Sequence, residues 1–151
     1  MAFDQPSMKG RALRLLGQRE HSRLELERKL RPHETEPGEI AGALDDLQAK
    51  GFIDEQRVLE SVVFRRAPRL GAQRVRQELQ AKGLAPQAIA AAVAELRGSE
   101  VERAREVWRK KFGVVAEDPQ TRAKQMRFLA GRGFGAEAIR RVVQGADEWL
   151  D

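Results

Sequence analysis

The stretch Gly71–Leu96, GAQRVRQELQAKGLAPQAIAAAVAEL, decides the fold. Its apolar residues recur at spacings of three and four, which is typical of helices that bury one face. Gly83 interrupts the pattern and favours a turn. The stretch therefore predicts two helices joined by a tight turn. The first helix closes at Leu79, and the second carries an apolar stripe made of Ile89, Val93 and Leu96.

The same frame appears twice more along the chain. Three leucines lie roughly fifty residues apart, and an isoleucine follows each after about ten residues: Leu30, Leu79 and Leu129, then Ile40, Ile89 and Ile139. From each isoleucine, apolar positions recur at i+4 and i+7, namely Leu44 and Leu47, Val93 and Leu96, and Val143 and Ala146. The pattern predicts an all-α fold of three tandem three-helix repeats, 1–53, 54–98 and 99–151. No segment shows the period of two that a strand requires.

Local signals set the expected helix ends. Ser22 with Glu25, and Ser99 with Glu102, have the spacing of a capping box. Pro86 suits the first turn of a helix, and Gly51 suits a left-handed C-cap. Further helix starts are expected at Thr35, Asp54 and Asp118-Pro119, and the last helix is expected to run from about Gly135 to Leu150.

Composition limits the size of each core and the kinds of chemistry. Charged residues make up 34% of the chain and aromatic residues only 5%. Each repeat can therefore bury only a small core and needs its neighbours, so we expect an elongated, curved array. The chain has no cysteine, which excludes disulfides and thiolate chemistry. The longest apolar run, Ala88–Ala94, is too short to span a bilayer, and no secretory signal is visible. We expect a monomeric cytoplasmic protein without a membrane partner.

No arrangement of residues predicts an enzyme. Gly131–Gly135 lacks the spacing of a phosphate loop and matches the helix stop at Gly83. The acidic pairs at 45–46 and 54–55 are explained by a solvated face and a helix cap, and nothing resembles a nucleophile triad. His21 and His33 lie at helix breaks, where we expect local roles in turns. We therefore expect no catalytic residue, no cofactor and no metal site.

The basic residues carry more information about a partner. The net charge is +5, which favours an anionic partner such as nucleic acid or an acidic protein surface. An acid-free segment, residues 65–76, holds five arginines, and the planar guanidinium can bind two oxygens of a phosphate or carboxylate. The alternative is an ordinary solvated face. The candidate partner-binding residues are Arg65, Arg66, Arg69, Arg74 and Arg76.

Several blocks in order along the chain resemble the bacterial RecX family. The first block is Ala12-Leu13-Arg14-Leu15-Leu16, followed by Arg19-Glu20-His21-Ser22, Glu25-Leu26 and Lys29-Leu30. The second is Leu47 with Gly51-Phe52-Ile53-Asp54-Glu55, and the third is Arg66, Gly71, Glu78-Leu79 and Lys82-Gly83. The last is Phe128-Leu129 with Arg132-Gly133-Phe134. The chain departs from the family pattern at Val58 and Leu59, where an aromatic and a small residue are commoner, and at Glu34.

The resemblance implies a modulator of the RecA recombinase. Similar proteins are arrays of three-helix repeats that lie in the groove of the RecA–DNA filament and inhibit ATP hydrolysis, strand exchange and filament extension. The implied role is regulation of homologous recombination and DNA repair, including the SOS response, and some similar proteins also bind single- or double-stranded DNA. The alternative is a DNA-binding transcription factor, because trihelical units with helix-turn-helix geometry are common DNA readers. The tandem repeat favours the first interpretation.

Overall fold

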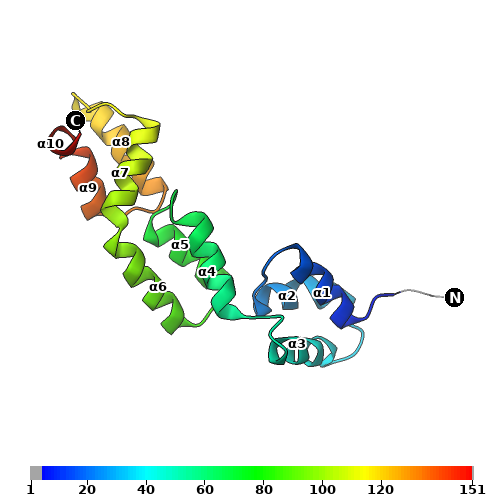
Figure 1. Cartoon of the computed structure of the whole chain (residues 1–151). Coiled ribbons are helices and arrows are strands. Elements are labelled where there is room, and N and C mark those ends of the chain that lie inside the picture. The colour runs from blue at the N-terminus through cyan, green and yellow to red at the C-terminus, as the bar shows by residue number, and fades with distance from the viewer. Residues whose placement is uncertain (1–4, 151) are drawn as a thin grey trace. The chain divides into compact units, whose positions relative to one another are not determined.

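Residues 5–150 are described by a computed structural model, and over that range the chain is helical and contains no strand. The helices are α1 (Met8–Gln18), α2 (Arg23–Leu30), the 3-10 helix η1 (Arg31–His33), α3 (Glu39–Ala49), α4 (Glu55–Arg66), α5 (Ala72–Ala81), α6 (Pro86–Gly98), α7 (Glu100–Lys111), α8 (Pro119–Gly131), α9 (Ala136–Val143) and α10 (Ala146–Trp149) (Figure 1). The predicted all-α class is confirmed.

The chain forms two compact units. Unit 1 contains the residues up to Ser61 together with Ala81–Ala85, and unit 2 contains Val62–Gln80 together with the residues from Pro86 onward. The boundary falls inside α4, so the sequence frame of three repeats does not coincide with the two units. The repeat boundaries at 53/54 and 98/99 stay a prediction.

Unit 1 is built around the apolar faces of α1, α2 and α3. Its core consists of Met8, Ala12, Leu26, Leu30, Ile40, Leu44, Leu47 and Ile53. The stripe of Ile40, Leu44 and Leu47 was predicted from the i, i+4, i+7 pattern, and all three side chains are buried. Complete burial of a leucine or isoleucine contributes about 1.5–3 kcal/mol, so these side chains supply most of the driving force for this unit.

Unit 2 buries the corresponding residues of the second and third frames. Val75, Leu79, Ile89, Val93 and Leu96 are buried on α5 and α6. A second cluster joins α7, α8 and α9, and consists of Ala104, Trp108, Leu129, Phe134, Ala138, Ile139, Val142, Val143 and Ala146. The Trp108 indole N–H donates to Gln125 Oε1 at 2.9 Å, which satisfies the one polar atom of a fully buried ring.

Most predicted caps are confirmed. The Ser22 hydroxyl accepts from the Glu25 amide, and the Glu25 carboxylate accepts from the Ser22 amide, which completes the capping box. Asp54 and Asp118 accept from first-turn amides, and Pro86 opens α6. Gly51 adopts φ +83°, as expected for a left-handed C-cap.

Two predicted caps are wrong. Ser99 makes no side-chain cap, because its hydroxyl donates to the Leu96 carbonyl oxygen, and Glu102 pairs with Arg105 instead of closing a box. Thr35 lies outside α3, which begins at Glu39 after Gly38 in the left-handed region. The expected single last helix is divided into α9 and α10, with a turn at Gln144-Gly145.

Candidate partner-binding surface

The five candidate arginines lie on or between α4 and α5 in unit 2, but the structure divides them into two groups. Arg65, Arg69 and Arg76 are exposed, and no ion pair involves them within residues 5–150. Arg66 and Arg74 are held by the protein itself. The five arginines thus lie on neighbouring elements, but only Arg65, Arg69 and Arg76 have guanidinium groups that are available to a partner.

Arg66 and Arg74 have structural contacts. Arg66 Nε donates to Glu78 Oε1 at 2.9 Å, linking the end of α4 to α5. Arg74 Nη1 donates to the Gly131 carbonyl oxygen at 2.7 Å, and its side chain covers Gly133. The pair between Arg66 and Glu78 could not be predicted from the acid-free segment 65–76, because Glu78 lies just beyond that segment and on the next helix.

Phe64 is the feature of this surface that sequence reasoning missed. Its side chain is 83% exposed, the largest fraction among the exposed large hydrophobic residues of the described chain. It directly precedes Arg65 on α4. Aromatic residues, phenylalanine included, and arginines are enriched at protein–protein interfaces relative to the rest of the surface. Helical spacing could have given the signal, since Phe64 lies off the buried stripe that contains Val58 and Val62.

The cations of the third repeat are largely engaged with acids or aromatic rings. Arg105 pairs with Glu102, Arg109 with Glu106, and both guanidinium groups lie over the Trp149 ring at 5.2 and 5.5 Å from its centroid. Arg140 and Arg141 both pair with Glu137. Most of the basic residues on α7 and α9 are therefore already paired within unit 2.

His21 has the local role expected for a histidine at a helix break. It is completely buried, its Nδ1 lies 3.0 Å from the Arg19 carbonyl oxygen, and its Nε2 lies 3.0 Å from Lys29 Nζ. The carbonyl can only accept and the ammonium can only donate, so Nδ1 carries the proton. Burial lowers the pKa of His21, consistent with a neutral imidazole.

The described residues contain no group of three or more His, Cys, Asp or Glu side chains arranged to hold a metal ion. No described helix is both long enough and apolar enough to cross a bilayer. The exposed chemistry of residues 5–150 includes many cations and two phenylalanine rings, Phe52 and Phe64, on a helical scaffold.

Comparison with known proteins gives the family. Three family models match in order: the first three-helix domain of RecX at residues 9–47, the second at 54–93 and the third at 99–143. A Regulatory protein RecX from Leptothrix cholodnii is 51% identical over all of this chain and 98% of its own length. One from Herminiimonas arsenicoxydans is 48% identical over 98% of each chain.

Solved structures agree on the fold. The crystal structure of RecX from Lactobacillus salivarius matches with a TM-score of 0.77 and 20% identity, covering 93% of this chain and 95% of the other. A second crystal structure of a regulatory protein RecX matches with a TM-score of 0.75 over 91% of this chain and 71% of the other, at 21% identity. With three consecutive domain matches and full-length relatives near 50% identity, the chain belongs to the RecX family.

Proposed function

We propose that this protein binds the RecA–DNA filament and inhibits ATP hydrolysis, strand exchange and filament extension by RecA. The observation that carries the proposal is membership of the RecX family along nearly the whole chain, with relatives named as regulatory proteins. The protein then acts in the cytoplasm as a regulator of recombination and DNA repair. It works by binding and not by catalysis.

The exposed residues of α4 and α5 are the proposed contact with the filament. Phe64, Arg65, Arg69 and Arg76 together offer one apolar ring and three free guanidinium groups. Phosphates and carboxylates both accept bidentate bonds from arginine, and an exposed phenylalanine gains from burial against a partner. Arg66 and Arg74 are assigned to the scaffold because each already bonds within unit 2.

Inhibition by binding requires a difference in affinity between two states of the filament. A ligand shifts a filament between states only to the extent that it binds one state more tightly. Contacts made by more than one repeat would add through effective concentration, so no single patch needs to be strong. We therefore expect inhibition to depend on several weak surfaces of the full chain.

The direct test is RecA ATPase activity on single-stranded DNA, titrated with the full-length protein. The proposed function predicts a saturable loss of ATP hydrolysis, and the protein without RecA should hydrolyse no ATP. Unchanged RecA activity at protein concentrations equal to RecA would overturn the proposal.

A transcription factor with helix-turn-helix geometry would behave differently. It would select particular duplex sequences in the absence of RecA, because base contacts in the major groove carry the specificity. Inhibition of RecA that is equal on several DNA sequences chosen at random supports the filament regulator. Tight binding to one selected duplex sequence, without an effect on RecA, would support the alternative.

A further inference from the structure

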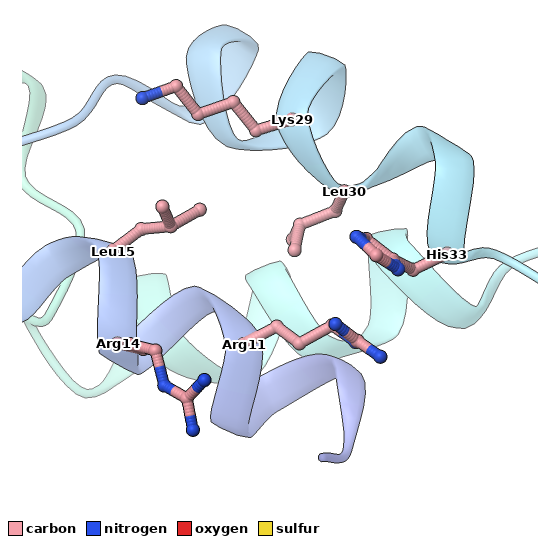
Figure 2. A pocket seen from close by; sticks show the side chains of 6 residues that line it. All are labelled: Arg11, Arg14, Leu15, Lys29, Leu30 and His33. Atoms are coloured by element: carbon pink, nitrogen blue, oxygen red, sulfur yellow. The ribbon is translucent and has the colours of Figure 1, made fainter. Parts of the chain in front are cut away.

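A cavity of about 170 Å³ opens in unit 1 between α1 on one side and α2 with η1 on the other. Six residues line it: Arg11, Arg14, Leu15, Lys29, Leu30 and His33 (Figure 2). Every polar side chain in this lining is basic. The cavity lies in a different unit from the α4–α5 arginines, so it is a distinct site.

The cations of this cavity have no carboxylate partner within residues 5–150, as is also true of Arg28 and Arg31, whereas six other basic residues of unit 1 are paired. Ion pairs hold Lys9, Arg19, Arg23, Lys50, Arg57 and Lys82. Within residues 5–150, no ion pair involves Arg11, Arg14 or Lys29, and Arg11 donates only to the neutral amide oxygen of Gln5 at 3.1 Å. Like charges gathered without an acid repel one another, and a bound anion removes that repulsion.

The side chains differ in how they can reach a ligand. Figure 2 shows that the Arg11 guanidinium and the His33 ring extend to the same side of the cavity, while Arg14 and Lys29 extend away from that pair. Lys29 Nζ is held 3.0 Å from the buried His21 Nε2, which fixes the direction of the lysine. Arg11 and His33 are therefore the two groups that can share one ligand, and Arg14 and Lys29 provide flanking charge.

The floor of the cavity is apolar. Leu15 and Leu30 face one another between the helices, and Leu30 belongs to the core of unit 1. An apolar wall excludes water from one side, which strengthens the attraction between a cation and an anion at that site. The half-buried Arg11 benefits most, because it is the least exposed of the four basic residues.

We propose that this cavity binds a phosphate group of a polynucleotide backbone, with Arg11 and His33 donating to the phosphate oxygens. The guanidinium of Arg11 can donate two parallel bonds to one phosphate, and His33 can donate a third from a ring nitrogen. Arg14 lies three residues further along α1 and extends away from Arg11, so it provides a second cation beside the first for a neighbouring phosphate of the same strand. A row of cations suits a chain of phosphates better than it suits a single small ion.

This inference deepens the proposed function, since the filament contains DNA, but its test does not need RecA. The full-length protein is titrated onto a fluorescent oligothymidylate at several salt concentrations. The variant Arg11→Gln/His33→Gln is compared with wild type, and Arg28→Gln, at an exposed arginine of unit 1 outside the cavity lining, serves as the matched control for lost charge. Circular dichroism and thermal melting check that each variant is folded.

The expected result is a loss of DNA affinity of about tenfold or more in the cavity variant. The slope of log K against log salt should also fall by about 0.7 for each phosphate contact removed. The single variant Arg11→Lys keeps the positive charge but loses the planar guanidinium that can bind two oxygens. Its affinity for DNA should therefore lie between those of wild type and Arg11→Gln. If Arg11→Gln/His33→Gln proves unstable, the DNA affinity of Arg14→Gln is measured instead, and it should show a smaller loss.

Three outcomes overturn the inference. One is DNA binding that is absent in the wild type or equal in the cavity variant. Another is binding of inorganic phosphate to the cavity, seen by calorimetry, without binding of oligothymidylate. The third is loss of RecA inhibition in the cavity variant with unchanged DNA affinity, which would assign the cavity to an acidic protein surface. The RecA assay is read separately, so failure of the proposed function and failure of the DNA site are distinguishable.

Discussion

Gly71 and Gly133 meet backbone against backbone in unit 2. The Gly71 amide donates to the Arg132 carbonyl oxygen at 2.8 Å, and the Gln73 amide donates to the Gly133 carbonyl oxygen at 3.2 Å. A Cβ on Gly71 would overlap the Gly133 carbonyl group and the Phe134 amide nitrogen. The start of α5 and the turn between α8 and α9 can approach so closely only because neither glycine carries a side chain.

Substitution of Gly71 by alanine should therefore destabilise unit 2. The added methyl group meets backbone atoms, which cannot move aside as a flexible side chain can. We expect a loss of about 1–3 kcal/mol or more in the free energy of unfolding, measured by urea denaturation. The matched control is Gly98→Ala at the end of α6, where nothing lies within 4 Å of an added Cβ. Equal stability of the two variants would contradict the close approach.

Glu100 connects the same two segments through its carboxylate. One oxygen accepts from the Ala72 amide at 2.7 Å and the other accepts from the Gly135 amide at 2.9 Å, and Arg103 lies beside it. The variant Glu100→Gln retains a single acceptor and leaves one of these amides unpaired. We expect a cost of about 1–3 kcal/mol, because an unsatisfied buried donor loses its full desolvation energy.

Glu102→Gln on the same helix is the control for Glu100→Gln. The Glu102 side chain is 76% exposed and pairs only with Arg105. Its replacement should change the free energy of unfolding by no more than about 0.5 kcal/mol. If Glu100→Gln unfolded at the same urea concentration as Glu102→Gln, the two amide bonds would not contribute to stability.

A chain that ends at Gly98 should lose structure in α5 as well as lose the third repeat. The truncation removes Glu100, Arg132 and Gly133, which satisfy three amides at the start of α5. We expect fast hydrogen exchange for the amides of α5 in the truncated chain and slow exchange in the full chain. Slow exchange in both would show that the second repeat folds alone, and only then would weakened RecA inhibition by the truncation measure the contribution of the third repeat.

The repeated apolar frame could be predicted from the sequence, but the contacts that join one segment to the next could not. Leu30, Leu79 and Leu129 could be predicted as buried because helical spacing alone places them on the inner face. Gly83 and Gly133 could be predicted as turns, and both adopt positive φ. That Gly133 also receives the side chain of Arg74 depends on residues far apart in sequence, which no local pattern reports.

The candidate partner-binding surface also has one part that could be predicted from the sequence and another that could not. Composition identified the acid-free segment that contains Arg65 and Arg69, since charge is a property of the sequence itself. It did not show that Glu78 neutralises Arg66, because that pair spans two helices. The basic cavity in unit 1 was also missed: Arg11 and His33 are separated by a complete helix, and only folding brings them to one side of Leu30.

Acidification should destabilise unit 1 through Glu25. Burial opposes ionisation of this carboxyl, but bonds from Arg19, the Ser22 amide and Lys82 outweigh it and lower the pKa of Glu25 from 4.5 to about 2. A folded-state pKa below the unfolded value means that the stabilisation is complete above about pH 4.5 and is lost as the pH falls toward about 2. Because solvent screens part of the interaction, we expect about 1–2 kcal/mol.

The measurement is the free energy of unfolding in urea from pH 6 to pH 2 for wild type and Glu25→Gln. The difference between the two proteins should shrink as the pH falls, because protonated Glu25 loses the same charge that the variant lacks. Glu36→Gln, at an exposed position in unit 1, is the control and should follow wild type at every pH. A constant difference between wild type and Glu25→Gln would contradict the lowered pKa.

Replacement of Phe64 and of the free arginines should weaken RecA inhibition without changing stability. Phe64→Ala removes the ring that is 83% exposed, so no internal packing is lost, while a partner that buries the ring would lose about 1–3 kcal/mol of binding. The concentration for half-inhibition of RecA ATPase should therefore rise about fivefold to a hundredfold.

Arg65→Glu/Arg69→Glu should also weaken inhibition, and more at low salt than at high salt, because exposed charges are screened. Arg66→Glu is expected to behave differently, since it places two carboxylates together at Glu78 and should lower the melting temperature.

Val114→Ala, at another exposed apolar residue of unit 2, is the control for Phe64→Ala. If Phe64→Ala and Arg65→Glu/Arg69→Glu both inhibited RecA as well as Val114→Ala does, the contact with the filament would lie outside this part of α4.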